Sequence, residues 1–247
     1  MHAHERIQAL KERIESDGSV VVSDLARDWQ VSEMTIRRDL KRLEEEGVVA
    51  RVHGGAVASE KLRFRQRRRE HLVEKQRSVA KLVDLIPATG CIYLDGSTTI
   101  FQLVTALEGR EGLQVATNNI DTFQGILAVK GIEPILIGGR LNRDTDNFVG
   151  PLARRCISGL NFDVAYFSSY GFDPDHGPCE PVLEDAETKQ YVAERAHRHC
   201  LALNHHKLGR PAPGAWDLPR DSSQLATDLE PADERLAPYR RHVAAIL

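Results

Sequence analysis

The sequence predicts an α/β protein with a small N-terminal winged helix-turn-helix domain and a larger α/β domain built on a mainly parallel sheet. Residues 1–58 follow the order helix, helix, tight turn, helix and β-hairpin. Residues 74–247 alternate short apolar strands with amphipathic helices, which is typical of a parallel sheet with helical cover. Between these patterns the charged stretch KLRFRQRRR indicates a basic linker over residues 59–73.

The composition is that of a globular protein. Of the 247 residues 41% are hydrophobic and 28% charged, and no apolar run approaches the roughly 18 residues that span a bilayer. The N-terminus lacks the apolar core of a signal peptide, and the four cysteines form no C-x-x-C pair. We therefore expect a reduced, cytoplasmic protein with no membrane partner and no cofactor. His197, His199, His205 and His206 surround Cys200 without ligand spacing, so no metal site is expected.

The net charge of −3 is unevenly distributed. Residues 1–71 carry 15 Lys and Arg against 13 Asp and Glu, a balance of +2, whereas residues 72–247 carry 18 against 23, a balance of −5. The N-terminal part therefore tolerates an anionic partner better than the rest of the chain does.

The predicted third helix, EMTIRRDLKRLEEE, has two different faces. Ile36, Leu40 and Leu43 share one face, which should pack into the small domain. The opposite face carries Met34 and four cations. A helix that presents such a face after a tight turn fits the DNA major groove, with its first turn at the base edges. The alternative interpretation is a solvated basic face, because three glutamates follow at once.

Small residues mark the expected ends of the helices. Ser23 and Ser32 are predicted N-caps of the second and third helices, and Gly47 is a predicted C-terminal stop.

The candidate DNA contacts combine the first turns of the third helix with the hairpin. We assign the first-turn residues to base edges and the hairpin residues to phosphates. The full set is Ser32, Met34, Thr35, Arg37, Arg38, Lys41, Arg42, Arg51, His53 and Gly54.

The segment VVVSDLARDWQVSEMTIRRDLKRLEEEGVVARVHGGA resembles the DNA-binding signature of the DeoR family of bacterial transcriptional regulators. Its core, S-x-x-T-I-R-R-D-L, runs from Ser32 to Leu40, with Gly47 and Arg51 at matching offsets. The resemblance implies a regulator that binds double-stranded operator DNA, and an effector domain similar to ribose-5-phosphate isomerase. Asp39 is expected to support the arginines or to cap locally, because DNA phosphates would repel its carboxylate.

The stretch YLDGSTTIFQL, residues 93–103, places small hydrogen-bond donors between a predicted strand and a predicted helix. Gly96 permits a tight turn there. The hydroxyls and amides of Ser97, Thr98 and Thr99 at a helix N-terminus favour an anion such as phosphate. Taken alone, the stretch is equally consistent with a plain N-cap.

Further motifs of the family follow in order along the α/β part, each after a predicted strand or at a helix start, which is the ligand-binding edge of such sheets. By this resemblance the effector is a phosphorylated sugar, with Lys189 and Lys207 supplying charge and Asp95, Asn118 and Asp185 orienting hydroxyls. The candidate effector-binding residues are Asp95, Gly96, Ser97, Thr98, Thr99, Thr117, Asn118, Gly139, Arg140, Asp185, Lys189 and Lys207.

Three positions depart from the family pattern. Asp185 stands where Glu is common, Asn204 where Asp is usual, and His206 where a small hydroxyl residue precedes the lysine. One hypothesis is that the pocket prefers a different or more anionic ligand. The alternative is drift at the pocket rim.

The leading functional hypothesis is a repressor of a carbohydrate catabolic operon that a phosphorylated sugar or sugar alcohol releases from DNA. A homo-oligomer is expected, because one winged helix reads few base pairs. The alternatives are an activator of the same architecture and an isomerase-like enzyme with Asp95 or Asp185 as base. The fused DNA-binding domain argues against the enzyme, so no catalytic residue is assigned.

Overall fold

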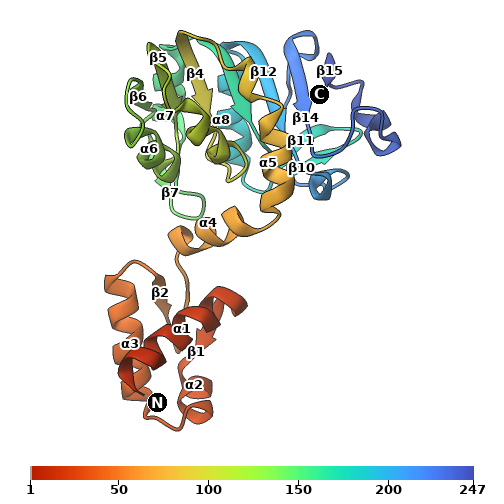
Figure 1. Ribbon diagram of the computed structural model, residues 1–247. Helices are drawn as coiled ribbons and strands as arrows, with labels where there is room; N and C mark the ends of the chain where they lie inside the picture. The colour runs from red at the N-terminus through yellow and green to blue at the C-terminus, as the bar shows by residue number, and fades with distance from the viewer. Residues whose placement is uncertain (1) are drawn as a thin grey trace. The chain divides into compact units, whose positions relative to one another are not determined.

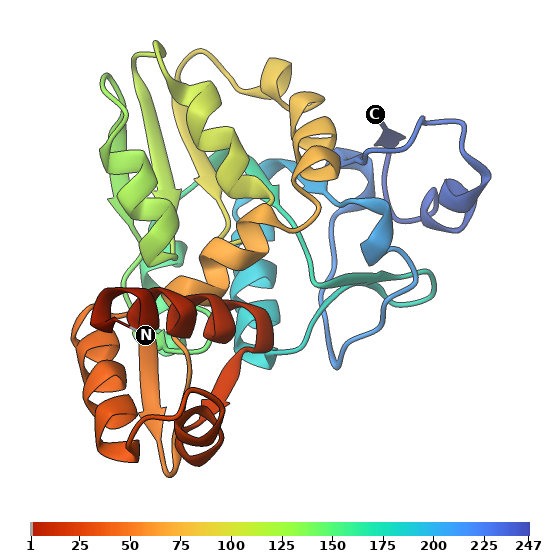
Figure 2. The same cartoon turned by 60° about the horizontal axis from the view of Figure 1, so that its bottom comes forward.

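The computed structural model describes residues 2–247, except for the side chains of residues 60–63 and 65. Two compact units, residues 1–70 and residues 71–247, make up the chain. Figures 1 and 2 show their elements, and each unit is described by itself. Within the described residues, none of the helices combines the length and the apolar character needed to span a bilayer.

The first unit is a winged helix-turn-helix, as the sequence predicts (Figure 1). Its three strands pair antiparallel in the order β1-β3-β2. The elements are α1 (Ala3–Asp17), β1 (Ser19–Val21), α2 (Val22–Asp28), α3 (Glu33–Glu45), β2 (Val49–Val52), β3 (Gly55–Ala58) and α4 (Glu60–Arg69). The charged stretch at residues 61–69 therefore lies within a helix.

The core of this unit is built by the predicted face of α3. Ile36, Leu40 and Leu43 are at most 1% exposed and belong to one apolar cluster with Leu10 and Ile14 of α1. The prediction of the buried face is therefore confirmed. The cations of α3 are left on the opposite, exposed face.

The ends of α3 follow the sequence prediction, whereas the start of α2 does not. Ser32 caps α3, since its hydroxyl accepts a hydrogen bond from the Thr35 amide at 3.2 Å. The predicted cap at Ser23 is wrong, because α2 already begins at Val22. The Val22 amide donates to the Gly54 carbonyl at 2.8 Å, so the hairpin satisfies a donor that a side-chain cap would otherwise take.

A buried ion pair joins α1 to α3. Arg6 Nε lies 2.5 Å from Asp39 Oδ2, and the two residues are 9% and 6% exposed. The hydrogen bond that Arg6 donates to Asp39 raises the pKa of Arg6. Asp39 therefore supports Arg6 of α1 rather than the exposed arginines of its own helix, and it is not a cap.

The second unit contains a seven-stranded sheet in the order β15-β14-β12-β9-β4-β5-β6, and every neighbouring pair is parallel. The predicted parallel sheet is confirmed. Its strands are β4 (Gly90–Leu94), β5 (Leu113–Thr117), β6 (Glu133–Leu136), β9 (Phe162–Phe167), β12 (Ala196–Ala202), β14 (Ser223–Ala226) and β15 (Ala245–Ile246).

Helices cover both faces of this sheet (Figures 1 and 2). The α-helices are α5 (Leu72–Ala80), α6 (Ile120–Leu127), α7 (Pro151–Ser158) and α8 (Leu183–Ala193). Short 3-10 helices are η1 (Val83–Leu85), η2 (Ile100–Leu107), η3 (His205–Lys207), η4 (Arg220–Ser222) and η5 (Glu234–Tyr239).

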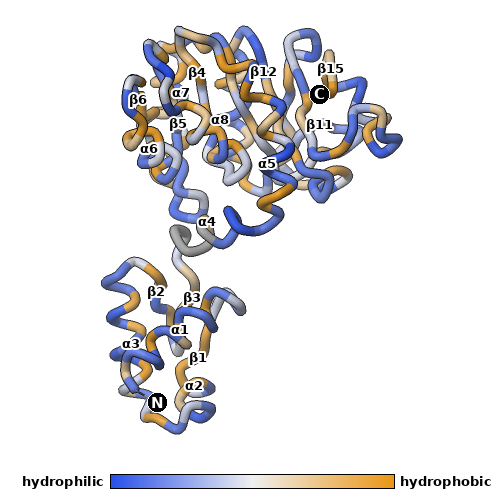
Figure 3. The backbone as a smooth tube through the Cα atoms, in the orientation of Figure 1, coloured by the Kyte–Doolittle hydropathy of each residue, from blue (hydrophilic) through white to orange (hydrophobic). Residues whose placement is uncertain are grey.

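Alternation along the strands creates two cores. In β9, Val164 and Tyr166 face the cluster formed with α5, η2 and α6, whereas Ala165 and Phe167 face the cluster formed with α7 and α8. Figure 3 shows the hydrophobic character of central strands such as β4. Because apolar side chains cover both faces of the sheet, its polar groups can meet a ligand only at the strand ends.

Several local predictions need correction. The helix expected over residues 98–107 is the 3-10 helix η2, because the Ser97 hydroxyl accepts from the Ile100 amide at 3.1 Å and starts a tight turn. The helix expected over residues 185–198 ends at Ala193, and β12 begins at Ala196. Five short strands were not expected: β7 (Arg140–Asn142), β8 (Asn147–Val149), β10 (Gly171–Asp173), β11 (Gly177–Glu180) and β13 (Gly214–Ala215).

Breaking the ion pair between α1 and α3 should destabilise the first unit. Asp39→Asn leaves the Arg6 guanidinium buried without its counter-ion, and we expect the free energy of unfolding to fall by about 3 kcal/mol. Urea unfolding followed by the fluorescence of Trp29, in a Trp216→Phe background that leaves one tryptophan, measures the loss. The control replaces both partners, Arg6→Met with Asp39→Leu, and should recover most of the stability. A loss below about 1 kcal/mol in Asp39→Asn would contradict the assignment.

Candidate functional site

The exposed face of α3 carries the residues predicted to meet DNA. Met34 is 66% exposed, and Arg37, Arg38, Lys41 and Arg42 are exposed around it. An exposed thioether beside cations at the start of a helix offers both apolar and hydrogen-bonding contacts to base edges.

The cations of this face differ in their partners. Arg37 pairs with Glu33 at 2.9 Å, and Arg42 with Glu46 at 3.2 Å. Lys41 and Glu45 lie 3.9 Å apart. Arg38, by contrast, forms no ion pair with any residue that the structure describes. Exposed pairs of this kind contribute about 0–1 kcal/mol each, so they exchange for a phosphate at little cost.

The hairpin of β2 and β3 supplies the remaining predicted contacts. Arg51, His53 and Gly54 are exposed, and Arg51 Nε lies 2.7 Å from Glu44 Oε2. Gly54 has a φ of +79°, a conformation that favours glycine. A Cβ at Gly55 would lie 2.1 Å from a backbone oxygen of β1, so this glycine permits the close approach of the strands.

The second candidate site lies where β4 meets β9. The chain passes from β4 to β5 and β6 on one side and then returns to β9 on the other. Parallel sheets bind ligands at the carboxyl ends of the strands at such a switch point. Asp95 directly follows β4, and Ser168 and Ser169 directly follow β9.

Asp95 organises this edge. It is 0% exposed, and its Oδ2 accepts from the Ser168 amide at 2.7 Å while its Oδ1 accepts from the Ser97 amide at 2.9 Å. Gly96 is required beside it, since a Cβ there would lie 2.3 Å from Asn147 Oδ1. The loop predicted to hold phosphate is thus fixed to two strands before any ligand binds.

Lys189 of α8 neutralises the carboxylates of the site. Its Nζ lies 2.5 Å from Glu180 Oε1 and 3.3 Å from Asp95 Oδ2. It also donates to the Ser168 carbonyl at 2.7 Å. Burial alone would lower the pKa of Lys189, but Glu180 and Asp95 together raise it. The Lys189 ammonium is therefore committed to these partners.

Lys207 has no such partner. Its Nζ donates to the Ser169 carbonyl at 2.6 Å and to Ser168 Oγ at 3.0 Å, and it forms no ion pair within the described residues. Burial lowers the pKa of Lys207 to about 8, and the neighbouring ammonium of Lys189 acts in the same direction. A bound anion would supply the missing counter-charge.

Two threonines of the loop complete the candidate anion site. Lys75 of α5 donates to Thr98 Oγ1 at 3.0 Å, and both residues are at least nine-tenths buried. Thr99 is 0% exposed, and its hydroxyl has no hydrogen-bond partner in the described part of the chain. Such a group is costly unless a partner arrives.

Sequence reasoning missed three contributors. Lys75 could have been found, because it shares the buried face of α5 with Ser78 and Val79 at helical spacing, where a charge is unusual. Glu180 and Asn147 could not, since each lies on a short strand that its sequence does not predict.

Other predicted residues hold the surrounding loops together. Asn118 Oδ1 accepts from the Tyr93 hydroxyl at 2.7 Å, and Thr117 Oγ1 accepts from a backbone amide at 3.2 Å. Gly139 packs against β8, where a Cβ would lie 2.8 Å from a backbone oxygen. Arg140 is exposed and pairs with Glu184. The structure thus groups Asp95 to Thr99 with Lys189 and Lys207. The other four predicted residues, Thr117, Asn118, Gly139 and Arg140, have their contacts in the surrounding loops.

The positions that depart from the family pattern have distinct surroundings. Asp185 accepts from Asn147 Nδ2 at 3.0 Å. Asn204 is 1% exposed, and its Oδ1 lacks a hydrogen-bond partner within the described residues. His206 is exposed, with its ring centroid 3.9 Å from that of His205.

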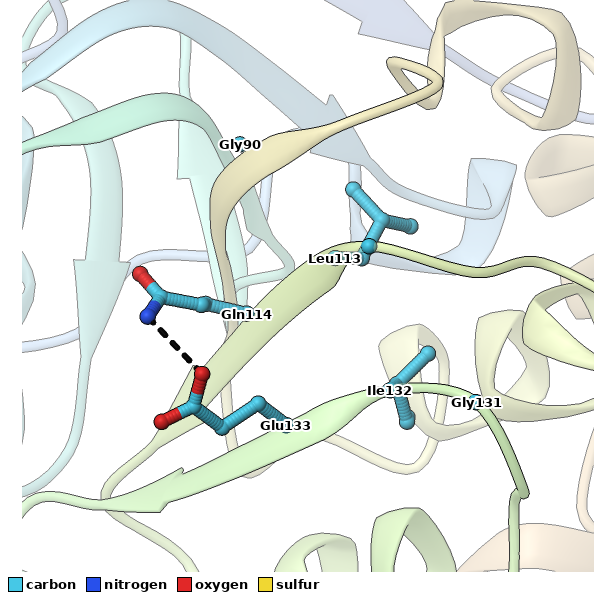
Figure 4. Close-up of a pocket in the computed structure, with 7 residues that line it drawn as sticks. Gly90, Leu113, Gln114, Gly131, Ile132 and Glu133 are labelled. Atoms are coloured by element: carbon cyan, nitrogen blue, oxygen red, sulfur yellow. Dashed lines mark hydrogen bonds between the residues drawn. The ribbon is translucent and has the colours of Figure 1, made fainter.

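A surface pocket lies at the opposite, amino-terminal edge of the sheet (Figure 4). Gln114 Nε2 donates there to Glu133 Oε2 at 3.0 Å. The lining residues are Gly90, Gly112, Leu113, Gln114, Gly131, Ile132 and Glu133. This set has a carboxylate and no basic side chain, so it is unsuited to a phosphate.

The two units define a class of protein, a transcriptional regulator with a DNA-binding domain and a separate sensor domain. Residues 6–61 match the DeoR-like helix-turn-helix domain, and residues 70–228 match the DeoR C terminal sensor domain. The chain belongs to the DeoR family of transcriptional regulators.

Several relatives with similar sequence identity match most of the chain. It is 28% identical over 237 residues to the HTH-type transcriptional regulator IolR of Bacillus subtilis, covering 95% of this chain and 94% of the relative. It is 28% identical to the lactose phosphotransferase system repressor of Staphylococcus epidermidis, covering 92% and 93%. It is also 28% identical to the glycerol-3-phosphate regulon repressor of Escherichia coli, covering 86% and 85%.

Among solved structures, ribose 5-phosphate isomerase A from Neisseria gonorrhoeae is similar to part of the chain. The TM-score is 0.38 at 12% identity, over 54% of this chain and 52% of the isomerase.

The buried carboxylate of Asp185 should reduce stability at neutral pH. Burial raises the pKa of Asp185 above its ordinary value of 3.8. The folded protein therefore binds this proton more tightly than the unfolded chain does, and stability is lost as the pH rises through the folded-state pKa. We expect Asp185→Asn to raise the free energy of unfolding at pH 7, with the gain vanishing as the pH falls to about 3.8.

Thermal unfolding of the full chain between pH 4 and pH 7 measures this difference. Asp144→Asn is the matched control, because Asp144 is exposed, and it should leave the melting temperature unchanged. A melting temperature for Asp185→Asn at pH 7 equal to or below that of the wild type would refute the expectation.

Proposed function

We propose that the protein represses genes of carbohydrate metabolism and leaves its operator when a phosphorylated sugar or sugar alcohol binds the sensor domain. The Lys207 ammonium carries this proposal, because it donates to Ser168 and Ser169 at the end of β9 and has no carboxylate partner in the described residues. The Ser168 amide in turn donates to Asp95, at the start of the loop that holds Ser97 to Thr99. A phosphate is the small anion whose charge and acceptor oxygens match that arrangement.

The unpaired ammonium of Lys207 supports a bound anion. Lys189 is neutralised by Asp95 and Glu180. Within the described part of the chain, the Lys207 ammonium is hydrogen-bonded to neutral oxygens only. The Lys75 ammonium donates to Thr98 Oγ1. A phosphate would accept from these ammonium groups and from the unpartnered Thr99 hydroxyl.

The carboxyl and amide groups nearby suit sugar hydroxyls. Asp185 faces Asn147 at 3.0 Å, and both belong to elements next to the loop. Retaining an ionisable carboxyl group at a buried position costs stability, which favours a binding role over a structural one. Asp185 is therefore the residue proposed to orient a hydroxyl of the ligand.

On the DNA side, we propose that α3 enters the major groove. Arg38 is proposed to read a base edge, because it has no competing ion pair in the described residues, whereas Arg37, Lys41 and Arg42 have. Arg51, His53 and Gly54 are proposed to contact phosphates. A winged helix covers a short site, so a homo-oligomer on repeated half-sites is expected.

Release requires that the ligand binds the DNA-incompetent state more tightly than the competent one. The relatives from Escherichia coli and Staphylococcus epidermidis are named as repressors of a glycerol-3-phosphate regulon and of a lactose phosphotransferase system, which supports repression. An activator of the same architecture is the alternative. An operator that overlaps the promoter favours repression, and one upstream of it favours activation.

Arg38 and Arg37 offer a matched comparison on one helix. If Arg38 contacts a base edge, Arg38→Ala should weaken operator binding by about 1–3 kcal/mol and relax specificity at one position. Arg37→Ala should cost less, because its guanidinium is already shared with Glu33. Fluorescence anisotropy with an operator selected from random DNA, and with unrelated DNA, measures both. Equal losses on the two DNAs for Arg38→Ala would assign Arg38 to phosphates instead.

Lys207→Met should remove the response to the effector without affecting DNA binding. Loss of one charge-assisted hydrogen bond costs about 1.5–3 kcal/mol, so we expect affinity for a phosphorylated ligand to fall roughly 10–100-fold. A thermal-shift screen over sugar phosphates and the matching free sugars identifies the ligand, and operator release is then titrated. Lys130→Met, at an exposed position, is the control. If only unphosphorylated sugars stabilise the wild type, the phosphate assignment is wrong.

A further inference from the structure

Three metal-binding side chains meet at the start of α5. His71 and Glu74 lie at its N-terminal end, and His206 belongs to η3, far along the chain. Their ligand atoms, one from each residue, all lie within 4.8 Å of one another. The cluster falls within the second unit, so its geometry does not depend on the placement of the first.

The three side chains are available as ligands. The His71 and His206 rings stack with centroids 4.0 Å apart, yet no hydrogen bond or ion pair of either ring, or of the Glu74 carboxylate, occurs among the described residues. Glu74 is half-buried, where an ionised carboxylate without a partner is unfavourable. A cation between the three side chains would satisfy all of them.

The surroundings bring the two rings together. His71 has a φ of +51°, a conformation that few residues other than glycine adopt, and it still stacks on His206. On the other side, His205 stacks against His206 at 3.9 Å, and its Nδ1 lies 2.6 Å from Asp228 Oδ2. His206 is thus packed between two other imidazoles, one of which Asp228 orients.

We propose that His71, Glu74 and His206 form a binding site for a divalent transition-metal ion of the zinc, cobalt or nickel class. Imidazole nitrogens with one carboxylate suit these ions, whereas calcium and magnesium prefer all-oxygen ligands. Bonds of about 2.0–2.2 Å would bring the ligand atoms to roughly 3.4 Å from one another. Exposed side chains such as His71 and His206 reach that spacing by small rotations.

The site would be incomplete as a closed structural centre, since it has three protein ligands. One carboxylate against a doubly charged ion leaves a net positive charge and at least one position for water or an anion. Glu74 and His206 directly precede Lys75 and Lys207 in the sequence. An ion held by this cluster would therefore fix the two segments that carry Lys75 and Lys207, the lysines next to the proposed anion site.

Metal titration of the full chain tests the proposal. The protein is stripped with EDTA, exchanged into metal-free buffer and titrated with Zn²⁺ by calorimetry and with Co²⁺ by visible absorption. We expect one equivalent per chain. Glu74→Gln and His206→Ala should each weaken binding at least about 10-fold, as loss of even an outer-sphere partner commonly does.

His197→Ala is the matched control, because His197 is exposed and outside the cluster, and it should bind as the wild type does. Far-UV circular dichroism and thermal unfolding without metal check that each variant is folded. Wild-type protein that binds neither ion overturns the proposal. So does unchanged affinity in either Glu74→Gln or His206→Ala, and a His2→Ala, His4→Ala variant then tests the N-terminal histidines as the ligands.

Discussion

The buried carboxylate of Asp95 is the group on which the sensor edge of the sheet depends. Its two oxygens bind the Ser97 and Ser168 amides, so one side chain joins the ends of β4 and β9 and sets the loop between β4 and η2. A carboxylate at 0% exposure needs a cation, and Lys189 supplies it. The position of the Lys189 ammonium in the site follows from this requirement.

Because Lys189 is paired with Asp95 and Glu180, the remaining lysines of the site determine whether an anion can bind. Among the described residues, Lys207 donates only to a hydroxyl and a carbonyl, so its positive charge stays unpaired at the sheet edge. Lys75 donates to the Thr98 hydroxyl. Asn118 and Thr117 lie at the neighbouring strand end, but their side chains accept hydrogen bonds from the protein itself. They therefore hold their loops in place. Strand ends at a switch point collect polar residues, and hydrogen-bond partners decide which of them stay free for a ligand.

The sequence was sufficient where structure is local. The alternation of apolar residues predicted the two domains and the parallel sheet, and the faces of α3 and the Ser32 cap followed from helical spacing. It was insufficient where partners come from distant segments. Arg6 with Asp39, and Lys75 with Thr98, are joined only by the folded chain. The short strands that carry Asn147 and Glu180 lack a pattern long enough to predict them.

The ion pairs on α3 have a consequence for how the regulator searches a chromosome. Glu33, Glu45 and Glu46 compensate three of the four cations on its exposed face. Affinity for arbitrary DNA depends on neutralising phosphates, and each of these three cations must first exchange its glutamate for a phosphate. Against the roughly 10⁶–10⁹ competing sites of a genome, such a surface shortens residence at each wrong site.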